Sequence, residues 1–169
     1  MAAERREHRL ALEILYAVEV GKTTLDDALR QAREQVGVFS RGDQARLEDP
    51  YEPEYPAVER RSDAPKATDW TLVEQIVRGT LAHREELAGE LAALLQHWTF
   101  DRLAGIDRIV LEMGAWELRY RHSVATTDVI NHAVELARRL STAQSASFVN
   151  ALLDAFAKTP VPPKSSTAS

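Results

Sequence analysis

The chain contains no cysteine, no long apolar run and no excess of positive charge, and each absence excludes a class of protein. Without cysteine among its 169 residues it has no disulfide, no thiolate nucleophile and no sulfur ligand for zinc. No apolar segment approaches the ~18 residues of a membrane-spanning helix. The N-terminus carries Glu4, Arg5 and Arg6 rather than the apolar stretch of a signal peptide. We therefore expect a soluble protein of the cytoplasm.

Positive charge is too scarce for a surface that binds nucleic acid broadly. The formal net charge is −5, from 21 basic and 26 acidic residues. Residues 68–97 carry five acids and two bases, whereas residues 98–159 carry seven of each. Any contact with RNA is therefore expected to be local.

Helical periodicity runs through most of the chain, and no segment has the alternation of a strand. The first predicted helix has its apolar stripe at Leu10, Ala11, Ile14, Leu15 and Val18 and ends at Gly21. Thr24 is placed to cap a second helix, with Asp27 three residues on, and this helix continues to about Val36.

The segment from Gly37 to Ala67 breaks this pattern. It holds four of the seven prolines, many charges and little periodicity. We expect a long surface insertion or a disordered loop, which is unusual for a compact domain.

Helical spacing resumes at Thr68 and continues to the C-terminal region. We expect a break near Gly79 or Gly89 and close helix contacts at Gly105 and Gly114. The sequence also predicts caps at Thr126 or Thr127 and at Ser145, and a frayed tail after Lys158.

Three apparent chemical motifs have simpler explanations. Gly21, Lys22 and Thr23 resemble the end of a phosphate-binding loop, but Tyr16 stands where that loop needs glycine, so we interpret Gly21 as a helix C-cap. The five histidines lack the paired spacing of a metal site, and His132 with Glu135 fits a solvent-facing helix pair. The serines near Ser145 are explained by capping. The sequence therefore predicts a protein without a metal site, without a cofactor and without enzymatic activity.

Four helix-like blocks follow one another between Trp98 and Asp154. They read WTFDRL, IDRIVLEMGAWEL, VINHAVELARRLS and SFVNALLDAF. In order and without detectable gaps, they resemble the C-terminal half of the NusB family of bacterial transcription antitermination factors. The match extends to Asn131 with the AVELAR run after it, and to Phe148, Val149 and Asn150.

The resemblance implies an all-α fold made of two packed three-helix bundles. The amphipathic helices and short connections agree with such a fold. We expect an N-terminal bundle at 1–97 that carries the insertion at 37–67. A C-terminal bundle at 98–158 and a flexible tail at 159–169 would complete the chain.

The resemblance also implies RNA-binding residues. In this family a basic cluster on the first helix, followed by a Leu-Tyr or Leu-Phe pair, helps to bind the single-stranded boxA element. Arg5 and Arg6 match that cluster, Leu15 and Tyr16 match the pair, and Arg9 adds a charge. The aromatic of the family's F-V-N motif, here Phe148, can stack on a base. From the residues alone, the arginines also fit a solvated helix face neutralised by glutamates, and Phe148 equally fits a core position.

The implied partners are boxA RNA, the ribosomal protein NusE and RNA polymerase with other Nus factors. The residues matching the NusE-facing surface are Tyr16, Val20, Asp107 and Glu117. Some family members form homodimers, which leaves self-association open. The chain departs from the family pattern at several positions. His8 stands where the family usually has a basic residue, Glu112 where an arginine is common, and Ala151 where a glycine is usual.

Two other functions compete with an antitermination adaptor. One is a helical protein-interaction module that has kept the fold and lost RNA binding, which the acidic balance and His8 favour. The other is the RNA-binding domain of an RNA cytosine methyltransferase, if the sequence is a fragment. Titration with boxA-type RNA, with and without the ribosomal partner, separates an adaptor from an interaction module.

Overall fold

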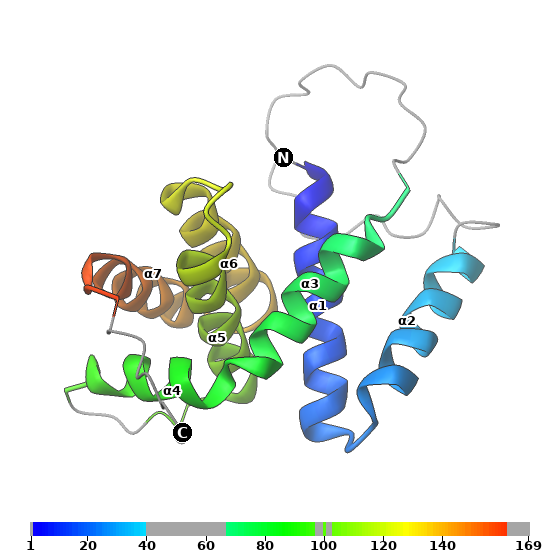
Figure 1. Ribbon diagram of the computed structural model, residues 1–169, viewed down its shortest axis with the longest axis horizontal. Helices are drawn as coiled ribbons and strands as arrows, with labels where there is room; N and C mark the ends of the chain where they lie inside the picture. Colours follow the sequence, from blue (N-terminus) through cyan, green and yellow to red (C-terminus); the bar gives the residue numbers. More distant parts are fainter. Residues whose placement is uncertain (1, 40–66, 97–99, 101–102, 162–169) are drawn as a thin grey trace, which may run out of the picture.

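A computed structural model describes residues 2–39, 67–96, 100 and 103–161 of the chain. These residues form seven helices and no strand: α1 (Ala2–Val20), α2 (Leu25–Phe39), α3 (Trp70–Ala82), α4 (Arg84–Ala93), α5 (Gly105–Tyr120), α6 (Thr126–Leu140) and α7 (Ala143–Lys158). The prediction of an all-α protein is therefore confirmed. In Figure 1, α2 lies on one side of α1 and α3, and α5, α6 and α7 lie on the other.

The helices pack in two groups of three around α1 and α5. Helix α1 contacts α2 and α3, while α5, α6 and α7 contact one another. The two groups meet where α5 packs against α1 and α3. Helix α4 rests on α5 and α7, so it covers the group that follows it in sequence.

The apolar stripes predicted from the sequence form one continuous core. Its fully buried side chains come from all parts of the fold and include Leu15, Ile76, Leu91, Ile109, Leu153 and Phe156. Gly114 lets α7 approach α5, because a Cβ atom there would lie 2.7 Å from Cδ1 of Leu153. The close approach predicted at Gly114 is therefore confirmed. At Gly105, where one was also predicted, an added Cβ atom would lie 3.9 Å from Cε2 of Tyr16, which is an ordinary contact.

The caps of α2 and α7 show where local sequence signals succeed and where they fail. The backbone N–H of Asp27 donates to Thr24 Oγ1 at 3.2 Å, and the Thr24 hydroxyl donates to Asp27 Oδ2 at 2.8 Å, which confirms the predicted cap of α2. Helix α7, in contrast, is capped by Thr142, whose Oγ1 accepts from the Ser145 backbone N–H at 3.0 Å. The prediction of a Ser145 cap was therefore wrong.

Two further boundaries differ from the sequence expectations. Helix α6 begins at Thr126 with Ala125 in the N-cap position and no side-chain cap, so neither Thr126 nor Thr127 caps it. The predicted break near Gly79 or Gly89 falls between the two glycines, at His83. Gly79 cannot be the break, because it lies inside α3 against the Trp116 ring.

Gly21 directly follows the last residue of α1, and its N–H donates to the Ala17 carbonyl at 3.0 Å, as expected for the predicted C-cap. The left-handed residue is the next one, Lys22, with φ of 51°. Helix α2 extends to Phe39, so the first three residues of the predicted insertion are helical. The remainder of that insertion, apart from Ala67, and the tail from residue 162 onward lie outside the described residues.

Candidate nucleic-acid and partner interface

The three predicted RNA-binding arginines lie on the exposed side of α1. Arg5 Nε pairs with Glu135 Oε2 of α6 at 3.0 Å, and the Arg5 side chain remains 55% exposed. Arg9 Nε pairs with Glu13 Oε1 at 3.0 Å, one turn along the same helix. Arg6 is exposed as well. The structure thus brings the predicted basic cluster to solvent, and it places α6 beside it.

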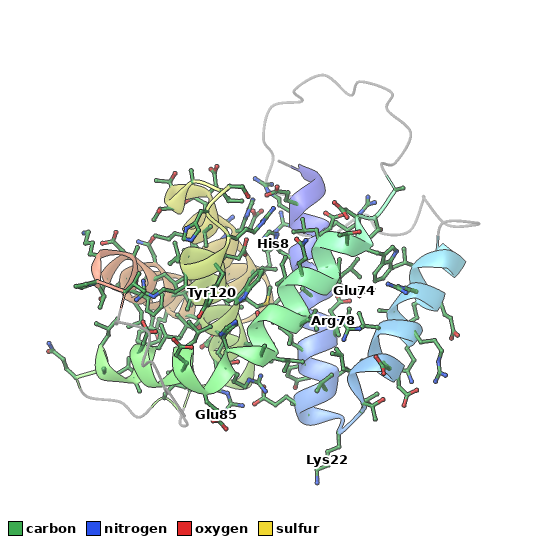
Figure 2. All side chains as sticks on the ribbon, viewed as in Figure 1. His8, Lys22, Glu74, Arg78, Glu85 and Tyr120 are labelled. Carbon is green, nitrogen blue, oxygen red and sulfur yellow. The ribbon has the colours of Figure 1, made fainter. Side chains whose placement is uncertain are left out.

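His8, in the middle of this cluster, points inward and not toward solvent. Its ring is 2% exposed and lies between two acceptors: the Glu4 carbonyl, 2.5 Å from Nδ1, and Glu117 Oε1, 2.6 Å from Nε2. Neither acceptor has a hydrogen to give when Glu117 is ionised, so both ring nitrogens donate and His8 is an imidazolium. Figure 2 shows His8 on the side of α1 that faces the C-terminal helices.

Glu117 is held by a second cation. Arg121 Nη1 donates to Glu117 Oε2 at 2.9 Å, and Arg121 Nη2 donates to Glu4 Oε1 at 3.3 Å. This buried network joins α1 to the end of α5. The sequence could not reveal it, since His8 and Glu117 are 109 residues apart.

The environment shifts the pKa of both partners toward their charged forms. Burial would lower the pKa of His8, but the hydrogen bond and negative charge of Glu117 outweigh it, and the pKa is raised. Burial would raise the pKa of Glu117, but His8 and Arg121 outweigh it, and the pKa is lowered.

The position of His132 contradicts the interpretation that it forms a solvent-facing helix pair with Glu135. It is 8% exposed and its ring centroid lies 4.6 Å from that of His8, so it is not part of a solvent-facing pair with Glu135. Burial lowers the pKa of His132, and the charge of His8 lowers it further. The environment thus favours the charged form of His8 and the neutral form of His132.

Phe148, the predicted stacking residue, lies at the boundary between core and solvent. Its side chain is partly buried and packs against the hydrophobic core. It lies in the second turn of α7, next to the fully buried Val149. The exposed part of the ring is compatible with base stacking, and the buried part anchors it.

The four predicted partner-binding residues separate into an exposed pair and a buried pair. On α1, Tyr16 is 42% exposed and Val20 is 56% exposed, one turn apart. Asp107 is 8% exposed and accepts a 2.8 Å hydrogen bond from the Ser145 hydroxyl, so that hydroxyl serves a tertiary contact and not a cap. Glu117 is buried in the His8 network. Tyr16 and Val20 thus provide the accessible part of this surface.

A second charged cluster beside Tyr16 and Val20 was missed at the sequence level. Glu19 of α1 pairs with both Arg84 of α4 and Arg108 of α5, and Arg84 also donates to Glu112 Oε2 at 2.9 Å. Burial raises the pKa of Glu112, and the nearby Arg84 offsets this only in part. Glu112 is therefore held in a buried ion pair with Arg84.

The described residues contain no group of three or more His, Asp or Glu side chains arranged to hold a metal ion. None of their helices is long and apolar enough to cross a membrane.

Comparison with known proteins identifies relatives over most of the chain. The sequence profile of the NusB family matches residues 5–158. The transcription antitermination protein NusB of Myxococcus xanthus (strain DK1622) is 32% identical, over 91% of this chain and 94% of that protein. The corresponding protein of Arthrobacter sp. (strain FB24) is 31% identical, over 90% and 91% respectively.

Solved structures show the same fold at lower identity. T. maritima NusB matches with a TM-score of 0.66 and 22% identity, over 94% of this chain and 92% of that one. A crystal structure of antitermination factors NusB and NusE in complex with dsRNA contains a chain that matches with a TM-score of 0.69 and 18% identity, over 94% and 98% respectively. The predicted arrangement of two packed three-helix bundles is thereby confirmed.

Proposed function

Because the chain belongs to the NusB family, we propose that it is an RNA-binding adaptor of transcription antitermination and not an enzyme. Its partners are boxA-type single-stranded RNA, the ribosomal protein NusE and RNA polymerase with other Nus factors. Such a role places the protein in the cytoplasm, where transcription takes place.

The observation that carries the assignment of the RNA surface is the exposure of the basic cluster on α1. Arg5, Arg6 and Arg9 are all exposed, while His8 between them is buried against Glu117. Exposed arginines at a helix end reach phosphates, and an aromatic ring such as Phe148 stacks on an unpaired base. We assign these three arginines and Phe148 to RNA binding.

We assign Tyr16 and Val20 to direct contact with the protein partner. Their exposure of 42% and 56% on consecutive turns of α1 leaves a strip of apolar surface open to solvent. Asp107 lies in the first turn of α5 close to Gly105, where an added Cβ atom would be 3.9 Å from Cε2 of Tyr16, so we assign Asp107 to the edge of this surface. Glu117 acts indirectly, by fixing α1 through His8.

The salt dependence of RNA binding tests the assigned arginines. Changing Arg5 and Arg6 together to alanine should flatten the slope of log K against log salt by about 1.4, because each phosphate neutralised in a single strand contributes roughly 0.7. The measurement is a titration of boxA-type RNA at several salt concentrations, with and without NusE. An unchanged slope with intact binding would remove these arginines from the site.

One alternative is favoured by a specific observation. Arg5 and Arg9 are already paired with glutamates, as expected for a protein-interaction module that has lost RNA binding. In that case the wild-type protein would bind NusE normally while RNA binding, with or without NusE, showed no preference for the boxA element.

A further inference from the structure

Glu135 of α6 bridges two arginines that lie far apart in the sequence. Its Oε2 atom is 3.0 Å from Nε of Arg5, and its Oε1 atom is 3.0 Å from Nη2 of Arg139. The Glu135 side chain is 18% exposed, whereas those of Arg5 and Arg139 are 55% and 50% exposed. The carboxylate is therefore turned inward, beneath two guanidinium groups that face solvent.

This arrangement leaves most of the donor capacity of both arginines available. Each guanidinium has five N–H donors, and Glu135 engages one nitrogen of each. The planar fork of arginine suits the two non-bridging oxygens of a phosphate. Because Glu135 restrains both side chains, less conformational entropy is lost when they bind an anion.

The surroundings of this bridge are locally positive in an acidic protein. Arg138, next to Arg139 in the sequence, is also exposed, so this end of α6 adds a third arginine near the two that pair with Glu135. Helix α7 packs against α6 and carries the partly exposed Phe148 in its second turn. Arginines that can bind phosphates therefore lie on α6, and an aromatic ring that can stack on bases lies on the adjoining helix α7.

We propose that Arg139 contacts a backbone phosphate of single-stranded RNA beside the phosphate bound by Arg5, with Glu135 holding both guanidinium groups at the junction of α1 and α6. The inference rests on the proposed RNA-binding function and extends it from α1 onto the C-terminal half of α6. Arg139 was not predicted as a binding residue from the sequence, because only the fold places it beside Arg5.

The test compares Arg139→Ala with a matched control, Arg30→Ala. Arg30 is 65% exposed and pairs with Asp27 three residues away, but it lies on α2, on the opposite side of α1 from α6 (Figure 1). Arg139→Ala should reduce the salt slope of single-stranded RNA binding by about 0.7, which corresponds to roughly fivefold weaker binding at 0.1 M salt. Arg30→Ala removes the same charge. It should change neither the salt slope nor the RNA affinity beyond the small, screened effect of one distant charge.

A third variant separates charge from packing. Arg139→Lys keeps the positive charge and should restore the wild-type slope. All three variants should melt close to the wild type, since exposed pairs one turn apart contribute little to stability. Near-wild-type melting therefore assigns any loss of RNA affinity to the contact itself.

The possible outcomes distinguish this inference from the proposed function. If the wild type binds RNA and Arg5/Arg6 replacement flattens the slope, but Arg139→Ala matches Arg30→Ala, only the Arg139 contact is overturned. If the wild type shows no salt-dependent RNA binding, both fail. Weaker binding of the protein partner with unchanged RNA affinity would assign the arginine pair to a protein contact and overturn the inference.

Discussion

At the scale of single residues, Phe148 and Phe156 of α7 offer a direct comparison of a surface aromatic with a core aromatic. Phe156 is 0% exposed, and the Arg119 guanidinium lies 4.0 Å from its ring centroid. Phe148 is only partly buried, eight residues earlier on the same helix. The same substitution at the two positions therefore separates base stacking from packing.

Phe148→Ala should weaken RNA binding by about 1–3 kcal/mol, the usual contribution of a base-stacking aromatic. Its effect on the free energy of unfolding should be clearly smaller than that of Phe156→Ala, which should lose roughly 3–5 kcal/mol as a fully buried truncation. RNA titration and chemical denaturation of the same samples check both values. A Phe148 variant that loses stability like Phe156→Ala, with normal affinity of the folded fraction, would make Phe148 a packing residue only.

The His8–Glu117 pair makes stability depend on pH. The raised pKa of His8 means that its contribution is complete below pH 6.5, the ordinary histidine value, and is lost as the pH rises through the raised value. The lowered pKa of Glu117 works in the other direction, because its contribution is lost as the pH falls below about 4.5 toward the lowered value. His132, with a lowered pKa, destabilises the fold as the pH falls below 6.5.

We therefore expect the free energy of unfolding to decline as the pH rises above 6.5, by about 1.4 kcal/mol for each tenfold gain in proton affinity of folded His8. His8→Gln should abolish this decline, whereas His122→Gln, at an exposed position, should preserve it. Urea denaturation between pH 6 and 9 measures the difference. If the free energy of unfolding declined equally in the wild type, His8→Gln and His122→Gln, His8 would not be the source of the decline.

At the scale of whole elements, the contact of α3 with α5 depends on one missing side chain. A Cβ atom at Gly79 would lie 2.1 Å from Cε2 of Trp116, so α5 can place its indole directly against the α3 backbone. Gly89 of α4 has the opposite environment, because a Cβ atom there would meet no other described residue within 4 Å. The two helical glycines thus serve different purposes.

Gly79→Ala should destabilise the protein by about 1–3 kcal/mol, because the Trp116 ring must move out of a packed position. Gly89→Ala should stabilise it by roughly 0.5–1 kcal/mol, since alanine is the better helix former and the added methyl group has open space around it. Thermal melting of the two variants gives the comparison. Equal effects of both substitutions would argue against close packing at Trp116.

Helix α1 is the element on which the two proposed surfaces meet. Its exposed side carries Arg5 and Arg9 near one end and Tyr16 and Val20 near the other. Between them, His8 fixes the helix to α5 through Glu117. The packing of a single helix therefore holds the proposed RNA surface and the proposed protein surface in a fixed relation.

At the scale of the whole molecule, α2 is attached to the rest by charge as well as by its packing on α1. Arg33 of α2 pairs with Glu74 of α3, and Arg78 of α3 reaches Asp26 of α2 at 3.8 Å. Figure 2 shows Glu74 and Arg78 on the side of α3 that faces α2. Arg33 also lies 5.3 Å from the ring centroid of Trp70. These contacts link α2 to α3 in addition to the packing of α2 on α1.

Replacing residues 40–66 by a linker of about ten Gly and Ser residues should leave a cooperatively folding protein. The segment from Gly37 to Ala67 holds four of the seven prolines and many charges, a composition that buries little apolar surface, and shortening a long loop changes its closure entropy only slowly. Far-UV circular dichroism and a thermal melt provide the check, and RNA titration tests whether the surface on α1 survives. Loss of the sharp transition would place the segment in the core.

The sequence by itself determined the helices, the apolar stripes and the exposed cluster on α1. These follow from interactions within one or two turns, which a 3.6-residue period and a local cap such as that of Thr24 encode directly. Family resemblance then supplied the arrangement of the bundles. Even here local signals had limits, since Ser145 looked like a cap although its hydroxyl donates to Asp107, 38 residues away.

Tertiary structure alone decided which charged side chains meet. His8 bonds to Glu117 across 109 residues, and Glu135 joins Arg5 to Arg139, although each pair looks like ordinary surface charge in the sequence. The physical reason is that periodicity fixes which side of a helix is apolar, but not the angle and register at which two helices cross. The crossing angle and register depend on close packing, as at Gly79 and Gly114. They determine whether a charged side chain is buried with a partner or left exposed at the surface.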